Sequence, residues 1–369
     1  MSHITRVAVL LGGRSAEHEV SLQSAKNVIE AIDRHRYEPV PVGIDKKGAW
    51  FLCEPDRCLV HPDDPKRIRL NCREDDRLAL VPGRPGHPLV RVAGGESIGP
   101  VDVVFPVLHG PLGEDGTLQG LLEMVDVPFV GAGVLGSSVG MDKVVMKRLL
   151  LDAGIPVARY QTSAWHEADQ LDFDRVSADL GLPLFVKPAN LGSSVGVSKV
   201  GNRLDFERAV TEAFRFDVRI LMEECVRGRE IECSVLGNEK VSASLPGEIL
   251  PRHEFYSYEA KYIDENGAGL VIPADLTGEA VERIQALSMD AFKALWCEGM
   301  ARVDCFLLES GEVVINEINT VPGFTRISMY PKLWDATGVP YPELIHRLIR
   351  LALERHERKG SLETSYTLR

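Results

Sequence analysis

Strand-like and helix-like segments alternate at the start of this chain, and this alternation constrains the fold more than any other feature of the sequence. Residues Arg6–Leu11 (RVAVLL) form a short apolar run that is typical of a buried strand. Apolar residues recur at helical spacing over Val20–Ile32, and Tyr37–Ile44 is predicted to form the next strand. A strand, a helix and a strand in this order favour two parallel strands joined by a crossover helix. We therefore expect an α/β fold that starts with a parallel sheet.

This pattern is interrupted over residues 45–100, where proline and glycine recur among short apolar pieces. Such a composition predicts an irregular insert with short strands or hairpins. A strand is expected again at Val101–Leu108. A strongly amphipathic helix is expected over Met141–Ala153, and Gly154 and Pro156 are typical of a helix end.

The rest of the chain contains further segments of both kinds. Its 369 residues correspond to two or three domains at about 150 residues each. Strands are predicted at Leu184–Lys187, Val197–Val200, Arg219–Glu223, Glu230–Leu236, Ala301–Leu308 and Val313–Asn319, and helices at Thr117–Val125, Phe206–Arg215, Glu279–Trp296 and Tyr341–Arg358.

The amino-acid composition excludes several classes of protein. Hydrophobic residues make up 44% and charged residues 26% of the chain, as in ordinary globular proteins. Acidic residues outnumber basic ones by 54 to 42, and the net charge of −12 provides no general basic surface for nucleic acid or an anionic membrane. No apolar run approaches the roughly 18 residues of a membrane span, and Val7–Leu11 is too short for a signal peptide. The seven cysteines lack C-x-x-C spacing, which favours reduced thiols in a cytoplasmic protein.

Polar residues share one face on each of two predicted C-terminal strands. Arg302 and Asp304 are two positions apart on the first strand, and Glu317 and Asn319 are two positions apart on the second. If the strands are antiparallel neighbours, two carboxylates and an amide converge beside a cation, and these hard oxygen ligands suit Mg²⁺ together with substrate phosphates. The alternative is a solvated sheet face with one salt bridge. A regular second strand also places on this face the two apolar residues Val313 and Ile315.

A glycine- and serine-rich loop, Gly192–Gly196 (GSSVG), follows the predicted strand that ends at Lys187. Glycine lets backbone N–H groups approach a phosphate closely, and the hydroxyls of Ser193 and Ser194 add donors. With Lys143 at the start of a predicted helix, the loop indicates a phosphate site. A simple hairpin turn is the alternative for the loop, and exposure to solvent for Lys143. Neither a Walker motif nor a G-x-G-x-x-G fingerprint after the first strand is present.

Three further segments have the composition of binding loops. His109–Gly116 carries a histidine and two acids on a glycine-rich segment, which predicts ligand contacts, with a hydrogen-bonded structural histidine as the alternative. Glu223–Val226 predicts either a nucleotide hinge or a charged loop. Arg252–Gly269 is rich in tyrosine, lacks regular patterns and is expected to act as a lid. No G-x-S-x-G or H-E-x-x-H motif indicates a hydrolase.

Taken in order, at least seven motifs resemble those of the D-alanine–D-alanine ligase family of the ATP-grasp superfamily. They are Leu10–Leu22 (LLGGRSAEHEVSL), His109–Gly120 (HGPLGEDGTLQG), Met141–Lys143 (MDK), Phe185–Lys199 (FVKPANLGSSVGVSK), Glu259–Ile263 (EAKYI), Ala301–Asp304 (ARVD) and Val314–Pro331 (VINEINTVPGFTRISMYP). The resemblance implies an ATP-grasp fold of three lobes. They are an N-terminal α/β domain (1–134), a central ATP-grasp subdomain (135–224) and a C-terminal subdomain (225–369).

The resemblance also implies a reaction. ATP would phosphorylate one D-alanine, and a second D-alanine would attack the D-alanyl phosphate to give D-alanyl-D-alanine, ADP and phosphate for peptidoglycan precursor synthesis. Two Mg²⁺ or Mn²⁺ ions and a homodimer are implied as well. The implied metal ligands are Asp304, Glu317 and Asn319, and the implied ATP-binding residues are Lys143, Lys187, Ser193, Ser194, Glu223, Glu224, Val226, Glu230 and Lys261.

The same resemblance implies the residues that handle the two amino acids. Glu17, His109, Gly323, Ser328 and Met329 would bind them, and Glu17, Ser193, Tyr262, Arg302 and Ser328 would take part in catalysis. In this family, Arg302 and the Gly323 backbone would stabilise the oxyanion, and Glu114 would support the site. The presence of Tyr262 resembles the ligases that use D-alanine as second substrate. The alternatives are a D-alanine–D-lactate ligase and a catalytically inactive nucleotide-binding regulator.

Overall fold

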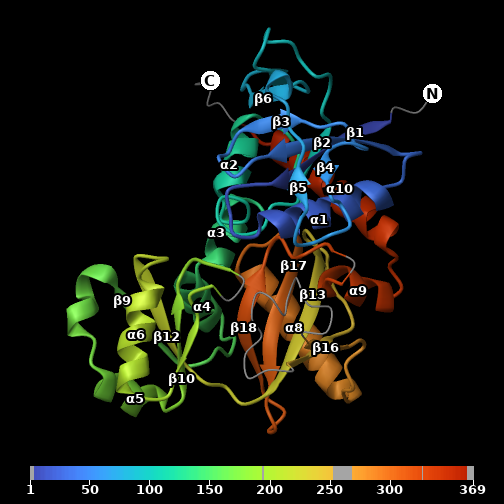
Figure 1. Cartoon of the computed structure of the whole chain (residues 1–369). Helices are drawn as coiled ribbons and strands as arrows, with labels where there is room; N and C mark the ends of the chain where they lie inside the picture. The colour runs from blue at the N-terminus through green and yellow to red at the C-terminus, as the bar shows by residue number, and fades with distance from the viewer. Residues whose placement is uncertain (1–3, 193–194, 252–267, 326, 364–369) are drawn as a thin grey trace, which may run out of the picture.

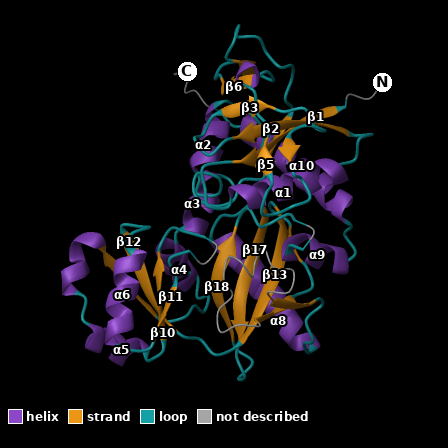
Figure 2. Ribbon diagram, viewed as in Figure 1, coloured by secondary structure: helices purple, strands orange, loops and turns teal. Residues whose placement is uncertain are grey.

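The structure is a computed structural model that describes residues 4–192, 195–251, 268–325 and 327–363. The described strands build three larger sheets, and helices pack against each of them (Figures 1 and 2). The first sheet lies at one end of the molecule, at the top of the view, and the other two lie next to each other at the opposite end. The mixed α/β class predicted from the sequence is confirmed.

The first sheet has six strands in the order β7-β6-β3-β2-β1-β8. Its centre is parallel, since β1 (Thr5–Gly12) pairs with β2 (Tyr37–Ile44) on one side and with β8 (Val103–Pro106) on the other. The insert extends this sheet with short antiparallel strands, as predicted. They are β3 (Trp50–Leu52), β6 (Arg77–Leu80) and β7 (Leu89–Arg91), while β4 (Leu59–Val60) and β5 (Arg69–Leu70) form a separate pair before the 3₁₀ helix η1 (Glu74–Asp76).

Helices cover both faces of this first sheet, because β1 is apolar on both sides. Val7 and Val9 pack in one cluster with residues of α1 (His18–Ala31) and α10 (Tyr341–Gly360). Ala8 and Leu10 pack on the other face with residues of α2 (Thr117–Met124). A helix from the far end of the sequence therefore completes the core of the first sheet.

The second sheet is antiparallel, in the order β11-β10-β12-β9. Its strands are β9 (Tyr160–Ala164), β10 (Leu184–Pro188), β11 (Ser198–Val200) and β12 (Arg219–Glu224), and the 3₁₀ helix η2 (Trp165–Gln170) follows β9. The helices α5 (Phe173–Leu180) and α6 (Arg203–Ala213) share an apolar cluster with this sheet. Because β10 and β11 pair antiparallel, the predicted hairpin around the glycine- and serine-rich loop is confirmed.

The third sheet has the order β16-β15-β13-β17-β18, with β14 paired to β13. Its strands are β13 (Arg229–Gly237), β14 (Val241–Ala243), β15 (Gly247–Pro251), β16 (Ala268–Val271), β17 (Gly299–Leu307) and β18 (Val313–Asn319). One face packs on α8 (Gly278–Ala294), in a cluster that contains Val303, Ile315 and Phe292. The opposite face carries the polar residues.

The helix predicted over Met141–Ala153 corresponds to α4 (Lys143–Asp152), and it is preceded by a helix that was not predicted, α3 (Val134–Met141). They are separated by Asp142, which has extended backbone angles (φ −84°, ψ 101°). Its carboxylate accepts hydrogen bonds from the N–H groups of Val144 and Val145 at 3.1 and 3.0 Å. Aspartate is a favoured N-cap because it satisfies these donors. The predicted helix starts two residues too early, because Met141 is the last residue of α3 and Asp142 is the cap between the two helices.

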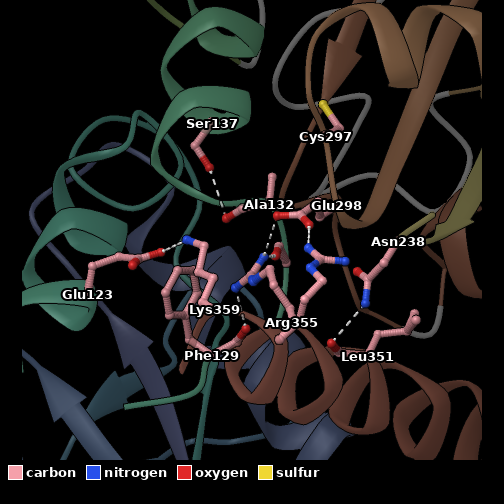
Figure 3. A network of polar contacts seen from close by, with 12 residues as sticks. Glu123, Phe129, Ala132, Ser137, Asn238, Cys297, Glu298, Leu351, Arg355 and Lys359 are labelled. Atoms are coloured by element: carbon pink, nitrogen blue, oxygen red, sulfur yellow. Dashed lines mark hydrogen bonds and ion pairs between the residues drawn. The ribbon is translucent and has the colours of Figure 1, made fainter. Parts of the chain in front are cut away.

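The helices α9 (Met329–Ala336) and α10 follow the third sheet in sequence. A polar network joins α10 to both ends of the molecule (Figure 3). The Arg355 guanidinium donates to Phe129 O at 2.8 Å and to Gly131 O, while Arg358 pairs with Glu239 and Glu298. The predicted boundaries at residues 134 and 224 stay predictions.

The structure also bears on two predictions made from composition, namely that the chain has no membrane span and that its cysteines are reduced. Within the described ranges, no helix combines the length and the apolar character needed to cross a membrane. All seven cysteines are free thiols, and five of them are buried.

Candidate active site

The antiparallel pair β17 and β18 forms the centre of the site. Its register places Arg302 opposite Asn319 and Asp304 opposite Glu317. Residues directly opposite each other share a face, so the predicted convergence of these four side chains is confirmed.

The expected position of Val313 and Ile315 on this same face is wrong. The register shifts between Asp304 and Cys305, since Cys305 pairs with Ile315 and the next pair is Asp304 with Glu317. One extra residue, Asn316, is thereby accommodated in β18, which changes the phase of the side chains. Val313 and Ile315 are buried in the apolar cluster under α8, whereas Glu317 faces the site.

Arg302 is held by two carboxylates. Its Nε and Nη2 donate to Asp304 Oδ1 and Oδ2 at 2.7 and 2.6 Å, and its Nε also lies 2.9 Å from Glu232 Oε2 on β13. Asn319 Nδ2 donates to Asp304 Oδ2 at 3.0 Å. Glu232 was not predicted as a site residue, although Glu230, Glu232 and Ser234 alternate with apolar residues along β13.

The donor set at this centre fits a magnesium site. Among the described residues, no group of three histidine, cysteine, aspartate or glutamate side chains has the arrangement of a metal site. The available donors are the carboxylates of Asp304 and Glu317 and the amide oxygen of Asn319. Mg²⁺ is commonly bound by one or two carboxylates and completed by water and substrate phosphates, so these residues suit it.

Two lysines predicted to bind ATP approach this centre from the second sheet and α4. Lys143 Nζ donates to Leu191 O at 2.6 Å and lies 3.8 Å from Glu317 Oε2. Lys187 pairs with Glu223 on the neighbouring strand β12. The Lys143 ammonium group therefore contacts the loop that precedes the undescribed Ser193 and Ser194.

Lys147, one helical turn after Lys143, is a buried lysine that was not predicted as a site residue. Its ammonium group pairs with Glu223, which thus lies between Lys147 and Lys187. Burial lowers the pKa of Lys147, although Glu223 opposes this effect. Burial alone would raise the pKa of Glu223, but the two lysines outweigh it and hold the pKa below its ordinary value. Lys187 has a raised pKa, because the attraction of Glu223 outweighs its burial.

The other predicted nucleotide residues lie at the ends of β12 and β13. Both carboxylate oxygens of Glu224 accept hydrogen bonds from Arg159, from its backbone N–H and from its Nε, each at 2.7 Å. Glu230 lies two positions before Glu232 on β13, and Val226 lies in the connection between the two strands. These residues are brought together at the junction of the second and third sheets.

The first sheet contributes buried acids and a histidine. Gly110 has a φ of +80°, and a side-chain carbon there would come within 2.6 Å of Glu17 Oε2. Glu114 Oε1 accepts a hydrogen bond from the Gly110 N–H at 2.7 Å. Burial, followed by the nearby charge of Glu17, raises the pKa of Glu114. Glu17 and Glu114 therefore form an acidic pair around Gly110.

His109 connects the first sheet to the loop after β18. Its Nδ1 donates to Val321 O at 3.0 Å, and its Nε2 lies 3.1 Å from Ser24 Oγ. Ser24 Oγ also accepts a hydrogen bond from the Phe324 N–H at 3.2 Å. Burial lowers the pKa of His109, so a neutral ring is favoured.

The residues predicted for the second carboxylate lie at the start of α9. Gly323 is next to Ser328, since a side-chain carbon on Gly323 would lie 2.8 Å from Ser328 Oγ. Ser328 Oγ accepts a hydrogen bond from the Thr325 N–H at 3.0 Å. The Met329 side chain is buried among Ile249 and Leu333, so only its backbone can face a substrate.

Four predicted site residues, Ser193, Ser194, Lys261 and Tyr262, lie outside the described residues, as does most of the expected lid Arg252–Gly269.

The chain is similar to known proteins over nearly its whole length. Residues 6–132 match the family model of the D-ala D-ala ligase N-terminus, and residues 149–350 match that of the C-terminus. The chain is 54% identical over 360 residues to a D-alanine--D-alanine ligase of Oceanobacillus iheyensis, covering 98% of both chains. It is 52% identical over 360 residues to D-alanine--D-alanine ligase A of Salmonella typhimurium, covering 98% of this chain and 99% of that one.

Solved structures agree with these relatives. The D-alanine-D-alanine ligase of Coxiella burnetii is 39% identical, with a TM-score of 0.83 and 97% of each chain covered. VanG D-Ala:D-Ser ligase of Enterococcus faecalis is 35% identical, with a TM-score of 0.82, covering 95% of this chain and 100% of that one. These neighbours confirm the predicted ATP-grasp fold. Both family models and close relatives along nearly the whole length lead to one conclusion: this chain belongs to the D-alanine–D-alanine ligase family.

Proposed function

We propose that this chain joins two D-alanine molecules to D-alanyl-D-alanine, with conversion of ATP into ADP and phosphate, as a step in cell-wall precursor synthesis. The observation that carries this proposal is the face shared by Arg302, Asp304, Glu317 and Asn319 on β17 and β18. Phosphoryl transfer to a carboxylate brings two anions together, the carboxylate of D-alanine and the γ-phosphate of ATP. A metal ion held by acidic residues next to an arginine supplies the positive charge that this step requires.

At the nucleotide end, Asp304, Glu317 and Asn319 would hold Mg²⁺ or Mn²⁺, two ions in all. Such ions would offset the charge of the transferred phosphoryl group. Other residues would bind ATP itself: Lys143, Lys187, Ser193, Ser194 and Lys261 at the phosphates, and Glu223, Glu224, Val226 and Glu230 at adenine and ribose. Because Glu223 and Glu224 are already paired with lysines and an arginine, we assign the adenine contact mainly to their backbone groups.

At the amino-acid end, Glu17 would receive the ammonium group of the first D-alanine, and His109 would hold the adjoining loop. Ser328 and the backbone of Met329, at the N-terminus of α9, would bind the carboxylate of the second D-alanine, where the helix dipole favours an anion. Tyr262, Ser193 and Glu17 would connect the lid to the site.

Two bond changes make up the reaction. A carboxylate oxygen of the first D-alanine attacks the γ-phosphorus of ATP, and the bond between this phosphorus and the ADP oxygen breaks. The neutral amine of the second D-alanine then attacks the acyl carbon, phosphate leaves, and the nitrogen loses a proton. Arg302 and the Gly323 N–H would stabilise the oxyanion of the second step. Closure of the site would keep water from the acyl phosphate.

A homodimer in the cytoplasm is part of this proposal. Seven free thiols and the use of ATP support the location. Sedimentation equilibrium measures the assembly, and a mass of one chain at micromolar concentration would contradict the dimer.

A coupled assay of ADP release tests the activity. D-Alanine with ATP and Mg²⁺ should give turnover and D-alanyl-D-alanine, whereas removal of the cation with EDTA should stop it. Further arms contain D-alanine with D-lactate or with D-serine, and mass spectrometry identifies the product. No turnover with D-alanine alone would contradict the proposal, and ATP binding without any phosphate release would favour an inactive regulator. The close relatives are D-alanine--D-alanine ligases, which does not favour the D-lactate alternative.

A further inference from the structure

Glu232 lies in the centre of the site but is absent from the set of residues predicted to act there. The strand register pairs it with Asp304 on β17, and Asp304 is in turn paired with Glu317 on β18. Three carboxylates therefore form a row across three neighbouring strands. Glu232 is buried, and a buried charge requires a partner.

That partner is Arg302, which Glu232 shares with Asp304. Arg302 Nε lies 2.9 Å from Glu232 Oε2 and 2.7 Å from Asp304 Oδ1, and Nη2 donates to Asp304 Oδ2 at 2.6 Å. One guanidinium thus contacts two carboxylates that project from adjacent strands.

Two positive groups compete for the Asp304 carboxylate. The predicted metal ion needs it as a ligand, and Arg302 needs it as a hydrogen-bond acceptor. The positive charge of Arg302 also repels a metal ion placed next to it. When a metal ion binds the Asp304 carboxylate, the attraction between this carboxylate and the Arg302 guanidinium is weakened. Glu232 is a second carboxylate in contact with Arg302, and it lies on the side of Asp304 away from Glu317.

We propose that Glu232 is a positioning residue, which retains Arg302 at the reacting centre while a cation occupies Asp304. The inference rests on the proposed function and deepens it, since it explains how one aspartate serves both a metal ion and an arginine. Arg302 shifts its contacts toward Glu232 and stays on the same face of the sheet.

Binding of Mn²⁺ in the presence of ADP tests this role without turnover, with free Mn²⁺ followed by electron paramagnetic resonance. In Glu232→Gln, Arg302 loses the charge of Glu232 and depends more strongly on Asp304, so Mn²⁺ competes less well. We expect a roughly 10-fold loss of Mn²⁺ affinity, the range of one charge-assisted hydrogen bond. The kcat should fall as well, with a smaller change in the KM for ATP.

A double-mutant cycle separates this role from a direct attraction between Glu232 and the cation. Arg302→Met removes the competitor, so adding Glu232→Gln to it should leave Mn²⁺ affinity within about twofold. An equal loss of affinity in both backgrounds overturns the proposal, because Glu232 would then act through its own charge. No loss of affinity in the wild-type background overturns it too.

Glu248→Gln is a matched control on the neighbouring strand β15. Glu248 accepts two hydrogen bonds from Arg229 at 2.8 and 2.6 Å. It is paired in register with Ile231, so it faces the other side of the sheet. This variant should keep the Mn²⁺ affinity and the kcat of the wild type.

Circular dichroism checks that Glu232→Gln is folded. If it is not, Glu232→Asp keeps the charge at a shorter reach and should show a smaller loss in the same direction. A wild-type protein that neither binds Mn²⁺ with ADP nor releases phosphate contradicts the proposed function itself. An active wild type whose folded Glu232 variants behave like Glu248→Gln overturns only this inference.

Discussion

At the scale of single residues, the site depends on charges that are buried in pairs and triads. Glu223 is the clearest case, because two lysines from different elements share its carboxylate. Removal of one cationic partner is expected to raise the pKa of a buried carboxyl group and to rearrange the side chains around it. Given the proposed contact of Lys187 with the ATP phosphates, we infer that Lys147 acts on ATP binding through Glu223 and Lys187.

Replacing Lys147 with methionine should weaken ATP binding while leaving D-alanine binding nearly unchanged. Glu223 then has Lys187 as its remaining lysine partner, which draws that ammonium group away from the phosphates. We expect the KM for ATP to rise roughly 10-fold, or about 1.4 kcal/mol. Steady-state kinetics with each substrate varied in turn measures this. Arg148→Met, at an exposed neighbouring position of α4, is the control, and an unchanged KM for ATP in Lys147→Met would contradict the role.

Glu114 predicts a pH dependence of stability. Its pKa is raised in the folded protein, so its protonated form is favoured by folding. The contribution is fully present below the ordinary glutamate pKa of about 4.3 and is lost as pH rises through the raised folded value. Urea unfolding at several pH values should show that wild type loses stability relative to Glu114→Gln over this window. A difference that is constant with pH would rule out the raised pKa.

The residues of the site were predictable where they follow strand periodicity. Arg302, Asp304, Glu317 and Asn319 were identified because residues two apart on a strand share a face. Lys147 was missed, although it follows Lys143 by four positions and so lies on the same side of α4. Charged residues on a helix are usually solvated, and only the tertiary structure shows that this one is buried.

At the scale of the elements, local departures from regular structure determine where side chains point. The change of phase in β18 lets Ile315 and Ile318 both face the core while Glu317 faces the site. The sequence contained a sign of this irregularity, because Ile315 and Ile318 are three positions apart and would lie on opposite faces of a regular strand. Strand and helix segments were predictable from apolar spacing, whereas caps and bulges depend on single residues.

The N-cap of α4 provides a test at this scale. Asp142 accepts two backbone N–H bonds and pairs with Arg219. Asp142→Ala should lower the free energy of unfolding by about 1 kcal/mol from the cap alone. It should also raise the KM for ATP, because Lys143 is the first residue of the helix. Urea denaturation and kinetics measure the two effects, and Asp142→Asn, which can still cap, should recover most of the stability.

At the scale of the whole molecule, α10 connects the first sheet to the third. Its buried Arg355 stacks on Phe129, with the guanidinium carbon 4.4 Å from the ring centroid, and donates to two backbone carbonyls (Figure 3). Its Nη1 also lies 3.9 Å from Glu298 Oε2 just before β17, so this arginine contacts segments next to both the first and the third sheet. Buried carbonyl groups that lose their donors cost free energy.

Replacing Arg355 with methionine should therefore destabilise the protein by roughly 3 kcal/mol, the cost of leaving buried carbonyl oxygens without donors. Chemical denaturation followed by both circular dichroism and tryptophan fluorescence measures the change. Weakened coupling between the ends should also make the two probes report different midpoints. Arg358→Met, which alters a more exposed part of the same network, should cost less, and equal losses would contradict the assignment.

The packing of α10 on β1 also has a consequence for biosynthesis. Leu11 and Leu344 share one apolar cluster, yet more than 300 positions separate them in the chain. β8 ends at Pro106 and α10 begins at Tyr341, so at roughly 5–20 residues per second the part of this face that α10 covers stays exposed for about 12–47 seconds after β8 has been made. During translation that exposed face is a natural point of attachment for chaperones, and the first lobe to be made is among the last to be completed.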